Sequence, residues 1–450
     1  MALTQLRHRE ALALSVLALS VLAVTVVGGQ AQAQSLSDFK CTGNPDFPWS
    51  EQIAGCTDAI GSKQFGGIDL AKALNDRGTA YYNTRDFDRA IADYDRAIGL
   101  APNVAVPLNG RGIVYLAKGD SDRALADFDQ ALRLAPRYIF ALNNRGFLYF
   151  RRRDFDRAIA DYDRAIAIDP NYLTAYVNRA DAYAAKDDHA QAIADYTQAI
   201  RLNPKIVKAY KGRGLQYAMT DATDLALADY NAAIGLDPQD PGLYADRGDV
   251  YRNKGDRDAA LADFGKAIAL DPKNWLTHDL RGRVYQDEGQ FDSALADYDA
   301  AIGINPKDAL AYDGRGVVYR AKGEFDRAMA DLTEAIALDP TDAGAYSVRA
   351  SIYESRGEFD LAIADYGKAI AIIPTDAEAY VYRAHAYKAK GDRDGALADY
   401  DKAIALDPHD ADAYRLRGAL YQDKGDLARA TADFDRGEKL GLQSLLAPKK

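Results

Sequence analysis

Residues 71–104, AKALNDRGTAYYNTRDFDRAIADYDRAIGLAPNV, contain the pattern that decides the fold. The pattern returns every 34 residues, and ten prolines spaced 34 residues apart run from Pro102 to Pro408. Because a fixed period of this length is typical of repeat proteins, we divide residues 71–444 into eleven repeats with proline at position 32. The repeats start at residues 71, 105, 139, 173, 207, 241, 275, 309, 343, 377 and 411.

Each repeat contains two stretches with helical periodicity. Position 8 is Gly or Ala throughout, position 11 is Tyr and position 20 is Ala in all eleven repeats, and position 24 is aromatic in ten. Positions 4, 8 and 11 share one face of a first helix, and positions 17, 20, 21, 24, 27 and 28 share one face of a second. Gly at position 15 in seven repeats, and proline at position 32, are typical helix ends. Since one helix pair cannot bury its apolar face alone, we expect the pairs to stack.

This 34-residue pattern resembles the tetratricopeptide repeat (TPR), over eleven consecutive units. The resemblance implies an all-α fold, an α-solenoid of stacked antiparallel helix pairs that form a right-handed superhelix. It also implies a concave wall built from the first helices, which in this family commonly binds peptides or partner proteins.

One column departs from the family pattern. Position 7, commonly Leu in TPRs, is Arg in all eleven repeats, and position 23 is Asp in all eleven. Both positions adjoin core positions, so we predict that each Arg pairs with an Asp across the helix interface, within a repeat or with its neighbour. The alternative is an eleven-step ladder of ligand contacts, but a ligand rarely needs identical contacts in every unit.

The first 33 residues have the features of a secretory signal peptide. Arg7 and Arg9 precede the apolar run 11–27, and Ala31-Gln32-Ala33 forms a small-residue cleavage site. An uncleaved membrane anchor is the alternative, although the run is short for spanning a bilayer. We therefore expect a periplasmic or secreted protein with 1–33 removed and no membrane insertion afterwards.

Residues 34–70 are expected to form an N-terminal cap with one helix at 50–62, because 53–61 parallels the second-helix phrase of the repeats. Cys41 and Cys56 are the two cysteines of the chain. In an oxidising compartment they are expected to form one disulfide, and two unpaired thiols are the alternative. Residues 445–450 are predicted to be a loose C-terminal tail.

A ligand-binding groove is predicted on the first helices of repeats one to three. Positions 2, 5, 9 and 12 face away from the partner helix and vary between repeats, and here most of them are apolar or amide side chains. Amides at regular spacing can hydrogen-bond an extended peptide while Phe side chains contact its side chains. The alternative is that the Phe residues pack between adjacent first helices. The predicted groove residues are Asn75, Asn109, Asn143, Ile113, Leu116, Phe140, Phe147 and Phe150.

A secondary basic cluster is predicted from Lys208, Lys211 and Arg252 on the polar first helices that follow. Such a cluster could hold a carboxylate or phosphate. A solvated face without a ligand is the default interpretation.

Composition and motifs argue against other function classes. The net charge of −11 disfavours binding of nucleic acid or anionic membranes. The sequence has no phosphate-binding loop, no dinucleotide-binding fingerprint and no H-E-x-x-H motif, so we predict no catalysis, no cofactor and no metal site. The sequence predicts an exported scaffold that binds a protein or peptide partner through its concave groove. A self-associating structural or assembly factor of the cell envelope is the first alternative, and an enzyme with a non-obvious site is the second.

Overall fold

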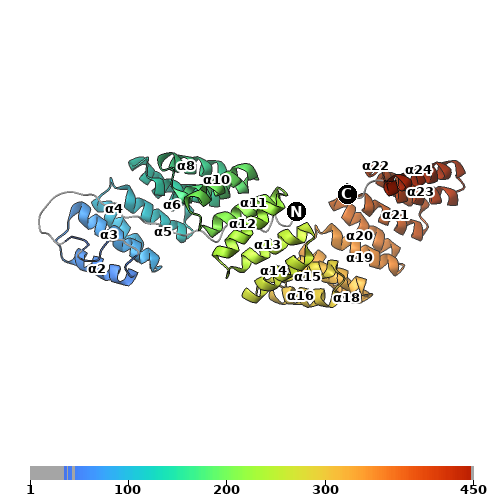
Figure 1. Cartoon of the computed structure of the whole chain (residues 1–450), viewed down its shortest axis with the longest axis horizontal. Coiled ribbons are helices and arrows are strands. Elements are labelled where there is room, and N and C mark those ends of the chain that lie inside the picture. Colours follow the sequence, from blue (N-terminus) through green and yellow to red (C-terminus); the bar gives the residue numbers. More distant parts are fainter. Residues whose placement is uncertain (1–34, 38, 43–45, 447–450) are drawn as a thin grey trace. The chain divides into compact units, whose positions relative to one another are not determined.

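The computed structural model describes residues 35–37, 39–42 and 46–446, which contain 23 helices and no strand (Figure 1). The predicted all-α fold is confirmed. The predicted signal peptide 1–33 and residues 447–450 of the predicted tail lie outside the described residues. The chain divides into two compact units, Met1–Pro238 and Gln239–Lys450, and each is described by itself.

The first unit contains a cap helix followed by the helix pairs of repeats one to five. Within it, the two helices of each repeat pack together, and each second helix also packs on the first helix of the next repeat. Its helices are α2 (Trp49–Gly61), α3 (Gly67–Asn83), α4 (Phe87–Leu100), α5 (Ala105–Ala117), α6 (Ser121–Leu134), α7 (Ile139–Arg151), α8 (Phe155–Ile168), α9 (Leu173–Ala185), α10 (His189–Leu202), α11 (Val207–Met219) and α12 (Thr223–Leu236).

The second unit contains repeats six to eleven, packed in the same way. Its last helix runs two residues past the predicted end of the array at 444. Its helices are α13 (Pro241–Lys254), α14 (Arg257–Leu270), α15 (Trp275–Asp287), α16 (Phe291–Ile304), α17 (Ala309–Ala321), α18 (Phe325–Leu338), α19 (Ala343–Ser355), α20 (Phe359–Ile372), α21 (Ala377–Lys390), α22 (Arg393–Leu406), α23 (Ala411–Asp423) and α24 (Leu427–Leu446).

Position 15, one or two residues after the end of each first helix, adopts the left-handed conformation. Seven repeats place Gly there, with φ between 71° and 94°. The other four repeats force a residue with a side chain into the same conformation, which costs about 1–2 kcal/mol relative to Gly. These four residues are Arg85, Arg153, Asp187 and Asp221.

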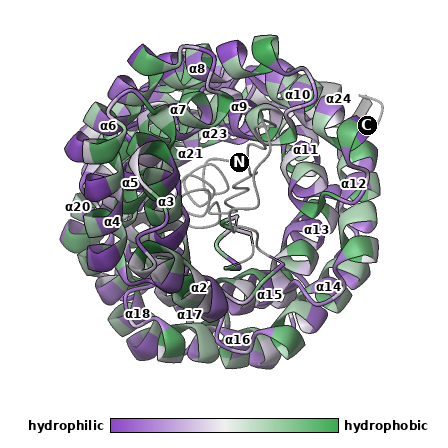
Figure 2. Cartoon of the chain, turned by 90° about the vertical axis from the view of Figure 1, so that its left-hand side faces the viewer, coloured by the Kyte–Doolittle hydropathy of each residue, from purple (hydrophilic) through white to green (hydrophobic). Residues whose placement is uncertain are grey.

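The small residues at position 8 make room for the aromatic ring at position 24. A Cβ added at Gly112 would lie 2.7 Å from Cε1 of Phe128, and one at Gly146 would lie 2.7 Å from Cε1 of Tyr162. The position-20 alanines are buried throughout, so the two helices of a repeat approach closely. Figure 2 shows hydrophobic and hydrophilic residues on the same helices, as expected when one face packs and the other faces solvent.

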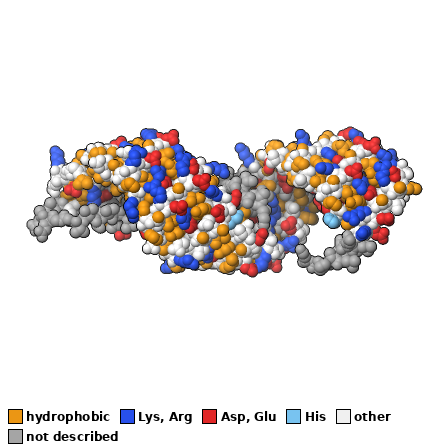
Figure 3. All heavy atoms as spheres, turned by 90° about the horizontal axis from the view of Figure 1, so that it is seen from above, with side chains coloured by type: hydrophobic (Ala, Val, Ile, Leu, Met, Phe, Trp, Pro, Cys, Tyr) orange, Lys and Arg blue, Asp and Glu red, His pale blue; other side chains and the backbone are white. Residues whose placement is uncertain are grey.

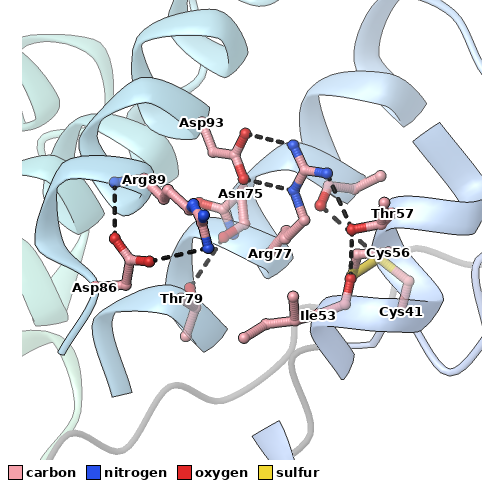
Figure 4. A network of polar contacts seen from close by, with 11 residues as sticks. Cys41, Ile53, Cys56, Thr57, Asn75, Arg77, Thr79, Asp86, Arg89 and Asp93 are labelled. Atoms are coloured by element: carbon pink, nitrogen blue, oxygen red, sulfur yellow. Dashed lines mark hydrogen bonds and ion pairs between the residues drawn. A yellow bond between two sulfur atoms is a disulfide. The ribbon is translucent and has the colours of Figure 1, made fainter. Parts of the chain in front are cut away.

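The predicted cap is a short helix fastened by a disulfide. Helix α2 covers residues 49–61, within a residue of the predicted 50–62, and packs on α3. Cys41 and Cys56 are joined by a disulfide, with their Cα atoms 4.6 Å apart (Figure 4). The cap therefore covers the first helix of repeat one, where no preceding repeat is available.

Candidate partner-binding site

The repeated arginine and aspartate columns form the ion pairs that the sequence predicts. In all eleven repeats, Nε and Nη2 of the position-7 Arg donate to the two carboxylate oxygens of the position-23 Asp of the same repeat, at 2.6–3.0 Å. The aspartate side chains are only 5–11% exposed. Hydrogen bonding to Asp127 raises the pKa of Arg111 above its ordinary value. These columns therefore stabilise the scaffold.

The third nitrogen of the same arginines connects neighbouring repeats, which the sequence did not reveal. Nη1 donates to the residue at position 25 of the preceding repeat, as Arg145 does to Asp129 at 2.7 Å. In repeat one the cap takes this role, since Nη1 of Arg77 donates to Oγ1 of Thr57 at 3.1 Å (Figure 4). We call these contacts the arginine ladder. Its other members are Arg111–Asp95, Arg179–Asp163, Arg213–Thr197, Arg315–Asp299, Arg349–Thr333 and Arg417–Asp401.

The three predicted groove asparagines are buried, and each makes a hydrogen bond inside the protein. Oδ1 of Asn109 accepts from Asn144 at 3.0 Å, and Oδ1 of Asn143 accepts from Asn178 at 2.9 Å. Asn75 donates to Oδ1 of Asp76 within its own helix, at 3.2 Å. The amides at positions 5 and 6 thus join the first helices of adjacent repeats. Sequence reasoning missed Asn144 and Asn178, although each follows its acceptor by 35 residues.

Asp76 occupies in repeat one the position that these donor amides occupy in repeats three and four. It is 8% exposed, and its Oδ2 has no hydrogen-bond partner among the described residues. Burial raises the pKa of Asp76 to about 6, against the lowering effects of the Asn75 hydrogen bond and of nearby Lys72. The carboxyl of Asp76 therefore keeps its proton to a higher pH than an ordinary aspartate does.

Ile113 and Leu116 are buried at 7% exposure, in a cluster with Phe128 and Leu148. Phe147 of the next repeat packs against this cluster and stays partly exposed. Ile113 and Leu116 hence contribute to packing between adjacent first helices. Phe147 packs there too, as the alternative interpretation proposes for the phenylalanines.

Phe140 and Phe150 are partly exposed and belong to two separate aromatic groups. Phe140 lies between Tyr138 and Tyr172 in edge-to-face contacts of 5.8 and 5.9 Å between ring centroids. Phe150 contacts Phe155 at 5.6 Å. Of the eight predicted groove residues, the three phenylalanines are the ones that retain partly exposed surface. We call Phe140, Phe147 and Phe150 the phenylalanine face.

Lys208 and Arg252 of the predicted basic cluster are ion-paired. Nζ of Lys208 is 2.7 Å from Oδ2 of Asp181, whose Oδ1 accepts from Tyr196. Arg252 donates from Nε and Nη2 to Oδ1 of Asp249. Lys208 and Lys211 lie on α11 of the first unit, whereas Arg252 lies on α13 of the second. In these ion pairs the carboxylates of Asp181 and Asp249 offset the positive charges of Lys208 and Arg252, which weakens their attraction for an anionic ligand.

Surface charges of both signs are interspersed on the face seen in Figure 3. In the part of the chain that the structure describes, no group of three or more His, Cys, Asp or Glu side chains is placed to hold a metal ion. The same part has no helix with the length and apolarity needed to cross a membrane.

Family models match most of the chain. Models described as tetratricopeptide repeat match residues 71–104, 105–138, 139–172, 177–241, 245–309 and 280–343, and one described as TPR repeat matches 350–391 and 384–425. The chain belongs to the tetratricopeptide repeat family. TPR proteins act as scaffolds for protein interactions, so protein partners are the general expectation for this chain.

Several solved structures are similar to the chain or to part of it. The MamA protein is 33% identical, covering 39% of this chain and 96% of MamA, with a TM-score of 0.35. A TPR protein from Parabacteroides merdae ATCC 43184 is 22% identical, covering 55% of this chain and 98% of that one, with a TM-score of 0.46. Yeast Tom70 is 18% identical, covering 82% and 92% of the two chains, with a TM-score of 0.42. No curated protein matches the chain.

Proposed function

We propose that this TPR protein is an exported, noncatalytic scaffold that binds a protein or peptide segment through the phenylalanine face. The observation that carries the proposal is the contrast between two sets of aromatic side chains. Nine of the ten position-24 aromatics are buried as framework, whereas Phe140, Phe147 and Phe150 stand at variable positions and are partly exposed. Large aromatic side chains in variable positions are typical anchors for protein partners.

Two features support export of the scaffold. The N-terminal sequence has the features of a signal peptide. The single pair of cysteines is joined by a disulfide, and such bonds persist in oxidising compartments. Fusion of residues 1–40 to a reporter enzyme that is active only outside the cytoplasm tests this part, and a reporter that stays inactive would contradict it.

The binding part of the proposal is tested with one triple variant. Phe140→Ala, Phe147→Ala and Phe150→Ala together remove the phenylalanine face while leaving the position-24 aromatics in place. The contact of Phe147 with the Phe128 cluster is removed with it. We expect affinity capture from a periplasmic extract to recover a partner with the native chain and to lose it with the triple variant. If each of the three anchoring residues contributes about 1 kcal/mol, their removal should weaken binding by about a hundredfold or more.

A matched control removes exposed apolar side chains from second helices. Leu225 and Leu361 are 53% and 48% exposed, on α12 and α20. The double variant Leu225→Ala and Leu361→Ala should retain the partner. If the triple variant retains the partner, or the control loses it equally, the phenylalanine face is not the binding surface. Circular dichroism of each variant checks that the helices are intact.

A further inference from the structure

Two ladders of charged side chains hold neighbouring repeats together. The arginine ladder joins position 7 to position 25 of the preceding repeat, and a second ladder on the surface joins a Lys or Arg at position 14 to the Asp at position 18 of the preceding repeat. The junction of α16 with α17 has both contacts. Arg315 Nη1 is 2.6 Å from Asp299, and Lys322 Nζ is 2.6 Å from Asp292.

The junction of α14 with α15 lacks both contacts. Position 25 is Gly265, where an added Cβ would lie 3.9 Å from Nη1 of Arg281, so the arginine is in place but the acceptor is absent. Position 14 is Glu288 and position 18 is Asp258, so like charges occupy the two sites of the surface ladder. Glu288 instead accepts a hydrogen bond from Gln290 of its own repeat, at 2.8 Å.

The other junctions inside the two units keep at least one of these contacts. Gly367 interrupts the arginine ladder between α20 and α21, but Lys390 still pairs with Asp360 there. Thr197 accepts from Arg213 where the surface ladder is missing between α10 and α11. At the α14–α15 junction the helices still pack, and the ring of His278 lies 3.4 Å from the carbonyl oxygen of Pro272. Packing therefore continues across this junction without either ladder contact.

We propose that the α14–α15 junction is a hinge built into the second unit, where adjacent repeats separate or change their mutual angle first. In a linear array each repeat contacts only its neighbours, so within this unit we expect the junction that lacks both charge contacts to open before the others. Surface ion pairs contribute little one by one, but here two are lost together and a like-charge pair is added. A local opening of this kind lets a repeat protein adjust to the shape of a partner.

The hinge is tested by native-state hydrogen exchange of the full chain, read by mass spectrometry. Residues 257–285 span the α14–α15 junction, and residues 291–319 span the fully paired α16–α17 junction. We expect amides of 257–285 to exchange about tenfold faster than their counterparts in 291–319, after correction for intrinsic rates. The double variant Gly265→Asp and Glu288→Lys supplies both missing partners and should remove this difference.

Two further variants separate charge pairing from other effects. Gly265→Ala improves helix propensity without supplying an acceptor, so it should recover only a small part of the protection. Asp299→Gly with Lys322→Glu copies the α14–α15 pattern and should make 291–319 exchange as fast as 257–285. The proposal is overturned if the two junctions exchange equally in the native chain, or if Gly265→Ala alone restores full protection. It is also overturned if the pairing variant leaves exchange unchanged.

Discussion

Arg145 and Asp161 form a bidentate ion pair between the two helices of repeat three, with both nitrogen–oxygen distances at 2.7 Å. The same guanidinium donates from Nη1 to Asp129 of repeat two at 2.7 Å. One side chain therefore stabilises both the fold of its own repeat and the contact with the preceding one.

Replacing the ladder acceptor should weaken this contact. Asp129→Gly removes the partner of Nη1 and lowers helix propensity, so we expect a loss of about 1 kcal/mol in the free energy of unfolding. Urea denaturation followed by circular dichroism measures it. Asp435→Gly is the matched control, because Asp435 has the same position in repeat eleven and accepts no arginine-ladder contact among the described residues. Equal losses in both variants would show that the hydrogen bond from Nη1 of Arg145 contributes nothing to the free energy of unfolding.

The left-handed residue at the end of α7 predicts a stabilising substitution. Arg153 has a φ of 61°, where the other repeats mostly use Gly. Arg153→Gly should raise the free energy of unfolding by about 1 kcal/mol, because Gly adopts this conformation without steric cost. The converse variant Gly119→Arg places a side chain where φ is 81° and should destabilise by a similar amount. Thermal unfolding measures both variants. If the two substitutions do not change stability in opposite directions, this explanation is wrong.

Asp76 predicts a specific pH dependence of stability. Its pKa is raised from 3.8 to about 6, so between these values the folded chain holds a proton that the unfolded chain has lost. The contribution of Asp76 to the free energy of unfolding is thus largest below about pH 4, falls as the pH rises to about 6, and changes little above that. The total fall is about 3 kcal/mol at 1.36 kcal/mol per pKa unit.

The Asp76→Asn variant isolates this effect. The free energy of unfolding of the variant minus that of the native chain should be more positive at pH 7 than at pH 4. The reason is that the amide has no ionised form to bury. Asp88→Asn is the control, since the hydrogen bond from Lys118 lowers the pKa of Asp88 and gives a dependence of opposite sign. A difference between Asp76→Asn and native chain that stays constant from pH 4 to pH 7 would refute the prediction.

The repeat framework could be predicted from the sequence because each column recurs in identical surroundings. Arg at position 7 and Asp at position 23 adjoin core positions, so their pairing followed from helical periodicity alone. The contact of Arg111 with Asp95 was not predicted, because it depends on how far one repeat is rotated against the next. Helical periodicity fixes the faces of a helix but not that rotation.

The candidate site was harder to predict for a related reason. Asn109 and Asn143 stand at positions that face away from the partner helix, yet the next first helix covers them. Position 5 therefore lies at the contact between neighbouring repeats, which a single helical wheel does not distinguish from the open side. Similarly, Lys208 looked available for an anion in the sequence, but Asp181 of the preceding repeat neutralises it.

A double-mutant cycle on Arg247 and Asp263 tests most directly the central claim that the repeated charges are scaffold and not ligand contacts. The two side chains form the same bidentate ion pair with both distances at 2.7 Å, and the Asp263 side chain is 8% exposed. Arg247→Leu and Asp263→Ala should each cost roughly 3 kcal/mol in the free energy of unfolding, because each leaves a largely buried charge unpaired. The double variant should cost no more than either single change, giving a coupling energy of roughly 3 kcal/mol. Strictly additive losses would contradict the claim.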